Sequence, residues 1–287
     1  MQHSRPSISI ITPTFNAGKH IAQCLSSVQD QTFRNFEHLI LDGGSTDGTI
    51  DTVKTHVNHH TNIRLYVDRD QGIYDAMNKG IAQAGGDWLY FLGADDALMD
   101  SHVLEKMWPF LAQAKAQFIY GNVFFQSLGR DYDHEFDMEK ILKRNICHQA
   151  IFYHQSIFKI IGLYDFHYKT QADYDLNLRS WLSGRINHGY APVTIASYSE
   201  GGLSSLQPDG LFKADFPKRS IAALLTGEMT GPNKIQILSK IFRKILLRYG
   251  FIDLLRHVFV SPQVFTRLSS FFWMCLTSPV YLLKKKN

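Results

Sequence analysis

The sequence of 287 residues has few cysteines and no apolar segment long enough to span a membrane. Its 3 cysteines, Cys24, Cys147 and Cys275, lie far apart, so we expect neither a disulfide framework nor a Cys-x-x-Cys zinc or redox site. The N-terminal residues also lack the apolar run of a signal peptide. We therefore expect the body of the protein to stay in a reducing cytoplasm.

Two glycine patterns of nucleotide-binding proteins are missing as well. No segment matches the Gly-x-Gly-x-x-Gly of dinucleotide-binding folds or the Gly-x-x-x-x-Gly-Lys-Ser/Thr of P-loop proteins. These absences weigh against a nicotinamide-dependent oxidoreductase and against an ATPase. If the protein binds phosphate groups, we expect a metal ion to hold them.

The net charge of +4 is the sum of two regions of opposite charge. Residues 213–287 contain 13 Lys and Arg but 3 Asp and Glu, a net charge of +10, which leaves residues 1–212 with a net charge of −6. Such a basic segment is typical of proteins that meet a nucleic acid or an anionic membrane surface.

The basic segment has the periodicity of an amphipathic helix. Apolar residues recur at spacings of three and four between positions 237 and 249, and basic residues take the other faces. Residues 268–283 are uncharged but shorter than the ~20 apolar residues that span a bilayer. RNA would not bury the apolar stripe, so we predict that residues 211–287 form a helical, basic region on a membrane surface, with no nucleic-acid partner. Packing of this helix on the rest of the protein is the alternative.

Short apolar strands alternate with helical segments over the first hundred residues, which predicts βαβ units and an α/β fold with a mostly parallel sheet. The strands are expected over residues 8–12, 36–41, 63–67 and 88–92. Beyond residue 101 the alternation ends, and we expect strands over 118–125, 151–153 and 193–198 and a helix over 172–182. Ligands of parallel sheets bind at the carboxyl ends of the strands, where Asp, Asn, Ser and Gly are abundant in this sequence.

Asp95 and Asp96 follow the fourth predicted strand. Adjacent carboxylates repel each other, and a divalent cation relieves that repulsion; oxygen ligands favour Mg²⁺ or Mn²⁺ over zinc. The alternative is a turn ahead of a helix, in which acidic residues are common. Asp42 has the same alternative, and we expect Asp47 to cap the helix that begins at Thr49.

Four ordered motifs in the first hundred residues resemble glycosyltransferase family 2. They are Ile-Ile-Thr-Pro-Thr-Phe-Asn at 10–16, Leu-Asp-Gly-Gly-Ser-Thr-Asp-Gly-Thr at 41–49, Asp-Gln-Gly-Ile-Tyr-Asp-Ala-Met-Asn-Lys-Gly at 70–80 and Phe-Leu-Gly-Ala-Asp-Asp at 91–96. The likeness continues to residue 176 and fades after about Ser199. It implies a GT-A fold over residues 1–210, with a nucleotide-sugar-binding half over 1–100 and an acceptor and catalytic-base half over 101–210.

The resemblance also implies roles for individual residues. The donor would contact Pro13, Thr14, Phe15, Asn16, Asp42, Asp70, Asn78, Ala94 and Asp96. Asp95 would bind Mn²⁺ or Mg²⁺, Asp173 would be the catalytic base, and His148 and Gln149 would bind the acceptor or a phosphate. Gly93 stands at the first position of the family's Asp-x-Asp motif, and Gly43 replaces a frequent second Asp, so the donor contacts depart from the usual pattern.

The implied activity is that of an inverting glycosyltransferase. It would move a sugar from a UDP-linked or similar donor to a saccharide or polyprenyl-linked acceptor at the inner face of the cell membrane, in the assembly of exopolysaccharide or lipopolysaccharide. Such a reaction needs a carboxylate within ~3 Å of the acceptor hydroxyl to accept its proton. Asp175 is the weaker candidate for this base, because it precedes Arg179 by four residues, the spacing of a helical ion pair.

Two alternatives stay open. A sugar nucleotidyltransferase would need a Gly-rich, Arg-containing loop after the first strand, and residues 13–16 lack it. A catalytically inactive GT-A module that only binds a membrane is the second alternative.

Overall fold

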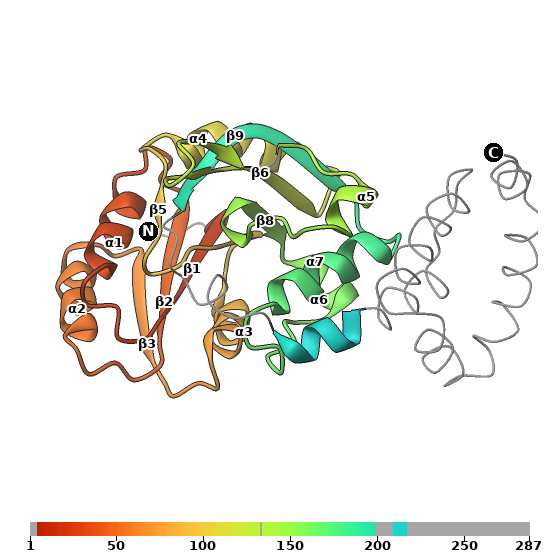
Figure 1. Cartoon of the computed structure of the whole chain (residues 1–287). Coiled ribbons are helices and arrows are strands. Elements are labelled where there is room, and N and C mark those ends of the chain that lie inside the picture. The colour runs from red at the N-terminus through yellow and green to blue at the C-terminus, as the bar shows by residue number, and fades with distance from the viewer. Residues whose placement is uncertain (1–4, 133, 199–208, 217–287) are drawn as a thin grey trace, which may run out of the picture. The chain divides into compact units, whose positions relative to one another are not determined.

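The computed structural model describes residues 5–132, 134–198 and 209–216 of the chain (Figure 1). Its strands are β1 (Ile8–Thr14), β2 (Phe36–Asp42), β3 (Ile63–Val67), β4 (Trp88–Phe91), β5 (Ala97–Leu98), β6 (Phe118–Phe125), β7 (Arg130–Tyr132), β8 (Ile151–His154) and β9 (His188–Tyr198). Its helices are α1 (Ile21–Gln29), α2 (Thr49–His59), α3 (Ile73–Gln83), α4 (Val103–Ala112), α5 (Met138–Ile141), α6 (Ser156–Ile161) and α7 (Ala172–Leu182), with a 3-10 helix η1 (His148–Ala150). The described strands form one sheet in the order β3-β2-β1-β4-β8-β6-β9-β5, with β7 paired to β6.

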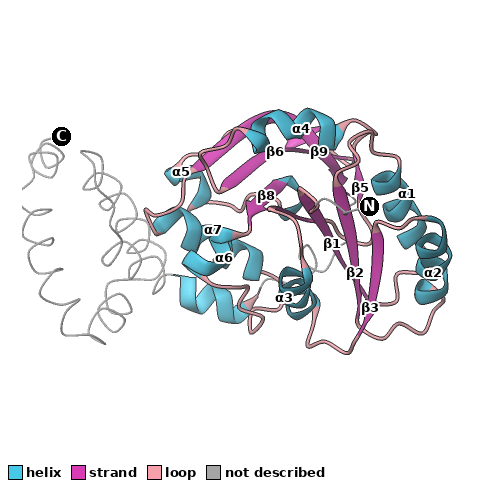
Figure 2. Cartoon of the chain, turned by 180° about the vertical axis from the view of Figure 1, so that it is seen from behind, coloured by secondary structure: helices cyan, strands magenta, loops and turns pink. Residues whose placement is uncertain are grey.

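The first half of the chain is the predicted α/β unit. β1 pairs in parallel with β2 and β4, and β2 pairs in parallel with β3. Every residue of β1 and β2 is buried, because α1 and α2 lie on one side of these strands and α3 on the other (Figures 1 and 2). Buried polar side chains of the two strands pair with one another: Ser9 Oγ donates to Glu37 Oε1 at 2.6 Å, and Thr12 Oγ1 lies 2.9 Å from His38 Nε2.

The second half has mixed strand directions. β8 runs antiparallel to β4 and β6, whereas β6 runs parallel to β9. β9 begins at His188, not at Val193 as the sequence pattern suggested. α4 is the helix that the turn interpretation of Asp95 and Asp96 expected next in the chain, and it includes Pro109, a residue that normally ends a helix.

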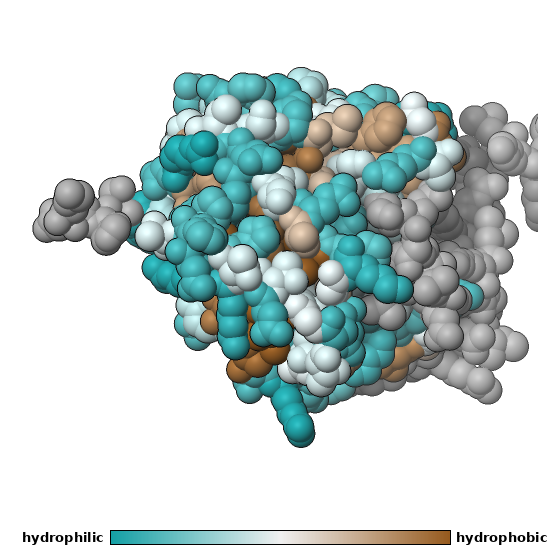
Figure 3. Space-filling model, turned by 90° about the vertical axis from the view of Figure 1, so that its left-hand side faces the viewer, coloured by the Kyte–Doolittle hydropathy of each residue, from teal (hydrophilic) through white to brown (hydrophobic). Residues whose placement is uncertain are grey.

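The predicted basic tail lies largely outside the described residues, which include it only as far as residue 216, in a helix over 210–216. In the described part of the chain, no helix combines the length and the apolar character that crossing a bilayer requires. Hydrophilic side chains dominate the face that α1 and α2 present, with hydrophobic side chains in small groups among them (Figure 3).

α3 packs closely on the sheet because it has a glycine at the contact. A Cβ on Gly80 would lie 2.5 Å from Ile11 Cγ2 and 3.2 Å from Leu41 Cδ2. Ile11 is fully buried in β1, so its branched side chain has little room to move. The glycine therefore determines how near the sheet α3 lies, and α3 begins with residues of the site described below.

We expect Gly80→Ala to lower the free energy of unfolding by about 1–3 kcal/mol, because the added methyl group overpacks the contact with Ile11. Urea unfolding followed by circular dichroism measures this change. Gly210→Ala is the matched control, since a Cβ at Gly210 meets open space, and it should change stability by less than about 1 kcal/mol. Equal losses in the two variants would contradict the close packing of α3.

Candidate active site

A cavity of about 1010 Å³ lies where β1 and β4 end. It is lined by the loops after these two strands, by the start of α3, by η1 and by the residues that lead into α7. Sites for small molecules have volumes of about 300–1,000 Å³, so this cavity is large enough for an extended ligand. Its position agrees with the rule that places ligands at the carboxyl ends of parallel strands.

Most of the residues predicted for the site line this cavity. They are Pro13, Thr14, Phe15, Asn16, Asp70, Ala94, Asp95, Asp96, His148, Gln149 and Asp173. Asp42 and Asn78 are not among the described residues that line it. The cavity thus joins residues from both halves of the chain.

Asp42 does not line the cavity, but its hydrogen bonds hold the loop after β2 in place. Its side chain is 1% exposed, and its Oδ1 accepts hydrogen bonds from the backbone N–H groups of Gly44 at 2.9 Å and Ser45 at 2.7 Å. Its Oδ2 accepts the Ser45 hydroxyl at 2.6 Å, and Ser45 Oγ in turn accepts the N–H of Asn16 at 2.8 Å. Asp42 therefore ties the loop after β2 to the loop after β1, in which Asn16 has a left-handed φ of 51°.

The side chains of Asp47 and Asn78 also form hydrogen bonds with backbone groups. Asp47 accepts hydrogen bonds from the Thr49 hydroxyl and the Gly18 N–H, which lower the pKa of its carboxyl. Its bond to the N–H of Thr49 supports the start of α2, but the N-cap position that we expected for Asp47 is taken by Gly48. Asn78 accepts from the N–H of Tyr164 at 3.0 Å and donates to the C=O of the same residue at 2.9 Å, so it fastens α3 to the chain after α6.

The carboxylates of Asp95 and Asp96 converge above Gly93. A Cβ on Gly93 would lie 2.9 Å from Asp95 Oδ1 and 2.6 Å from Asp96 Oδ2, so the glycine leaves a space between two negatively charged oxygens. A side chain at position 93 would have to displace one of these carboxylates. Two carboxylate oxygens facing one space suit a hard divalent cation such as Mg²⁺ or Mn²⁺. Among the described residues no group of three or more His, Cys, Asp or Glu side chains converges on a metal position, so a bound molecule or water would supply the other ligands.

Gln149 connects this carboxylate pair to the second half of the chain. Its Nε2 donates to Asp96 Oδ2, and its Oε1 accepts the thiol of Cys147 at 2.7 Å. The two bonds fix which way the Gln149 amide faces. Tyr90 of β4 donates to the backbone C=O of Gln149 at 2.9 Å and holds η1 against the sheet.

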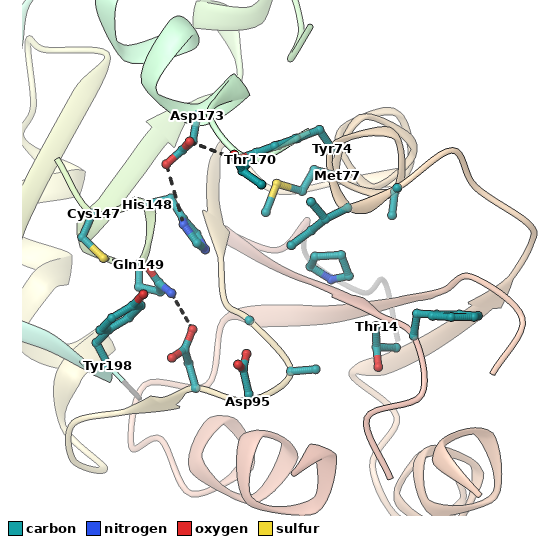
Figure 4. A pocket seen from close by; sticks show the side chains of 18 of the residues that line it. Thr14, Tyr74, Met77, Asp95, Cys147, His148, Gln149, Thr170, Asp173 and Tyr198 are labelled. Carbon is teal, nitrogen blue, oxygen red and sulfur yellow. Dashed lines mark hydrogen bonds and ion pairs between the residues drawn. The ribbon is translucent and has the colours of Figure 1, made fainter. Parts of the chain in front are cut away.

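Asp173 is buried in the first turn of α7 and faces the cavity (Figure 4). The Tyr74 hydroxyl donates to its Oδ1 at 3.0 Å, and Asn145 Nδ2 donates to its Oδ2 at 2.7 Å. Burial raises the pKa of the Asp173 carboxyl above its ordinary value, and the nearby His148 and the bond from Tyr74 offset part of this effect. A carboxylate with a raised pKa that faces a cavity is well suited to accept a proton.

His148 lies between Asp173 and the loop of Asp95 (Figure 4). Its Nδ1 is 4.0 Å from Asp173 Oδ2, and its Nε2 is buried without a hydrogen-bond partner among the residues that the structure describes. This nitrogen can therefore accept from or donate to a bound ligand. Asp175, by contrast, forms the predicted helical ion pair, with 2.8 Å between its Oδ2 and Arg179 Nε.

Several residues of the cavity were not predicted. Tyr74 lies within the motif at 70–80, but its role was not assigned, and no pattern indicated that Asn145 would reach Asp173 across 28 positions of sequence. Three further lining residues are aromatic and come from neighbouring strands, namely Phe125, Tyr132 and Tyr198. Their rings contact one another in series, with centroid separations of 4.5 Å and 4.8 Å on either side of Phe125.

Comparison with known proteins gives the family. The family model described as Glycosyl transferase family 2 matches residues 9–163. The chain is 40% identical over 216 residues to the PGL/p-HBAD biosynthesis glycosyltransferase of Mycobacterium bovis (strain BCG / Pasteur 1173P2), a match that covers 74% of this chain and 84% of that protein.

Two solved structures share the fold. The crystal structure of S. aureus TarS 1–349 in complex with UDP-GlcNAc has a TM-score of 0.67 at 19% identity and covers 92% of this chain and 80% of that one. The mannosyltransferase PcManGT from Pyrobaculum calidifontis, in complex with GDP-Man and Mn²⁺, has a TM-score of 0.59 at 14% identity and covers 98% of this chain and 79% of that one.

We expect Asp42→Ala to lower the free energy of unfolding by about 1–3 kcal/mol, because three partly buried donors lose their acceptor. Asp42→Asn should cost less, since the amide keeps an oxygen for Gly44 and Ser45, and its Nδ2 can donate to the Ser45 hydroxyl. Thermal unfolding of the two variants beside the parent protein measures the difference. If Asp42→Ala were as stable as the parent protein, the loop would not depend on this carboxylate.

Proposed function

The chain belongs to glycosyl transferase family 2, and from that membership and the site geometry we propose that it moves a sugar from a UDP-linked donor to a saccharide or polyprenyl-linked acceptor with inversion at the anomeric carbon. It is a glycosyltransferase with a GT-A fold. The observation that supports the proposal most directly is the placement of the buried Asp173 in one cavity with the Asp95 and Asp96 pair. The TarS complex contains UDP-GlcNAc, which supports UDP as the nucleotide, and the name of the M. bovis relative supports a role in glycolipid assembly.

Asp173 is the proposed base. A sugar hydroxyl is a weak nucleophile until a carboxylate accepts its proton as the new bond to the anomeric carbon forms. Asp173 is positioned for this step because Tyr74 and Asn145 each donate to one of its oxygens, and a carboxylate has about four acceptor sites in all. The proton of the acceptor hydroxyl passes to the carboxylate, and the bond from the anomeric carbon to the diphosphate breaks in the same displacement.

The donor would lie across the ends of β1 and β4. Phe15 is 64% exposed at the mouth of the cavity and offers an apolar surface for the nucleoside, near the fixed backbone of Asn16. Asp95 and Asp96 would hold a divalent cation, which supplies positive charge where the departing diphosphate becomes more negative. His148 Nε2 is free to bond an oxygen of the donor or the acceptor.

Membrane association is part of the proposal. The net charge of +10 in residues 213–287 and the apolar stripe between positions 237 and 249 would place the enzyme on the inner face of the cell membrane, where lipid-linked acceptors are found. These residues lie outside the described part of the chain, so the sequence alone supports this step. Assembly of exopolysaccharide or lipopolysaccharide is the pathway class that we propose.

We expect Asp173→Asn to lower the transfer rate by on the order of 10²–10⁴-fold with donor binding kept, because the amide cannot accept the hydroxyl proton. UDP release from a panel of UDP-sugars with Mn²⁺ and lipid-linked saccharides measures transfer, and calorimetry measures donor binding. In the parent enzyme the rate should fall as the pH drops through the raised pKa of Asp173, since only the ionised carboxylate accepts a proton.

Asp175→Asn is the matched control two residues along the same helix. It removes the charge that pairs with Arg179, so it should lower the melting temperature and keep most of the transfer rate. Loss of donor binding in Asp173→Asn, or an unchanged rate, would rule out Asp173 as the base.

We expect the full-length protein to float with vesicles that contain phosphatidylglycerol and to stay unbound with vesicles of phosphatidylcholine alone. Binding should weaken in about 1 M salt, where the Debye length is about 3 Å. Replacing Lys284, Lys285 and Lys286 by glutamate should weaken binding at low salt. An absence of binding to both kinds of vesicle would contradict the membrane proposal.

A further inference from the structure

A chain of three side chains lies behind Asp173 in the interior of the protein. Asn145 Nδ2 donates to Asp173 Oδ2 at 2.7 Å, Asn177 Nδ2 donates to Asn145 Oδ1 at 2.8 Å, and the Tyr153 hydroxyl donates to Asn177 Oδ1 at 2.8 Å. Asn177 and Tyr153 are completely buried. The three residues come from the segment before η1, from α7 and from β8, so the hydrogen bonds join elements that are distant in sequence.

In this chain each side chain donates to the next one toward Asp173. A side-chain amide accepts only at its oxygen and donates only from its nitrogen. Asn177 Nδ2 also donates to the backbone C=O of Ile146 at 3.4 Å, a group that can only accept, so the nitrogen of Asn177 faces Asn145 and its oxygen faces the Tyr153 hydroxyl. The oxygen of Asn145 is then occupied, and its nitrogen has to face Asp173.

We propose that Asn145 is a positioning residue for the base: its amide, which Asn177 and Tyr153 prevent from turning round, keeps a donor on Asp173 Oδ2 and orients the carboxylate toward the acceptor hydroxyl. This inference rests on the proposed function, in which Asp173 is the base. A proton on Oδ2 would point at the N–H of Asn145, so the arrangement disfavours the protonated, inactive form of Asp173 at this oxygen. The Tyr74 hydroxyl holds Oδ1 at 3.0 Å and completes the orientation.

The other titratable groups that face Asp173 act differently. His148 Nδ1 is 4.0 Å from Oδ2, beyond hydrogen-bond distance, and attracts the carboxylate only when the ring is protonated. Burial raises the pKa values of Tyr74, Tyr153 and Tyr164 well above their ordinary range, so these side chains stay neutral while Asp173 titrates. Among the described residues, Asn145 is therefore the donor to Oδ2 whose bond does not depend on pH.

Asn145→Leu tests the proposal, because leucine has a similar size and no donor. We expect the midpoint of the Asp173 titration to move to higher pH by about one pH unit, a tenfold change in the ionisation constant that matches the loss of one hydrogen bond to a charged group. The carboxyl carbon NMR resonance of Asp173, identified by its absence in Asp173→Asn, reports this midpoint in the protein without substrate. The acidic limb of UDP release should move by the same amount, with the donor KM unchanged.

Two further variants distinguish a specific effect on the Asp173 midpoint from a general loss of structure. Asn177→Leu keeps Asn145 but removes the group that orients it, so the midpoint should move in the same direction by a smaller amount. Asn122→Leu is the matched control: Asn122 is a buried asparagine that accepts the Tyr190 hydroxyl at 3.0 Å and does not line the cavity, and its replacement should leave the midpoint in place.

An unchanged Asp173 midpoint in Asn145→Leu or in Asn177→Leu would overturn the proposal, as would an equal shift in Asn122→Leu. If the NMR midpoint moves as expected but the acidic limb of UDP release stays in place, Asn145 orients a carboxylate that is not the base. That result would refute the proposed function of Asp173 and leave the structural hydrogen-bond chain intact, so the two failures can be told apart.

Discussion

The antiparallel pairing of β8 with β4 is the constraint on which the site depends. β1, β2 and β4 run in parallel, so their loops meet at one edge of the sheet. β8 enters beside β4 in the opposite direction, with Tyr90 opposite Phe152, and the residues just before β8 therefore lie where β4 ends. This pairing brings η1 beside Asp96 and allows Gln149 to bond it. Had β8 run parallel to β4, the same residues would lie at the far end of the strand.

Asp173, the proposed base, illustrates a conflict between burial and charge. Water near Asp173 would compete with the acceptor hydroxyl, yet burial disfavours the ionised carboxylate that the reaction needs. The nearby His148 and the hydrogen bonds from the neutral Tyr74 and Asn145 side chains offset part of this effect of burial on the carboxylate. His148 Nδ1 lies 4.0 Å from Asp173 Oδ2, so His148 acts on the carboxylate without a hydrogen bond to it.

The predictable part of this fold follows from local patterns. Residues 8–12, 36–41 and 88–92 are rich in large apolar side chains because both faces of these strands are covered, and such enrichment is visible without any knowledge of the fold. The residues that follow them, such as Asp95, could therefore be assigned to one sheet edge. Asn145 was missed because an asparagine in a loop gives no signal of a partner such as Asp173, 28 positions away.

The roles of the aspartates show where family motifs and geometry diverge. Asp42 and Asp95 both follow buried strands, yet Asp42 accepts three hydrogen bonds from its own loop, whereas Asp95 is exposed beside the empty position of Gly93. A carboxylate whose oxygens are occupied by protein donors supports the backbone, and one that faces open space can bind a cation. Sequence motifs record both kinds of aspartate in the same way, because each lies at the end of a buried strand beside a small residue, Gly43 for Asp42 and Ala94 for Asp95. The number of protein donors around each carboxylate distinguishes the two aspartates. Asp42 accepts three hydrogen bonds and supports the backbone at Asn16, whereas Asp95 is the residue that we propose to bind a metal ion.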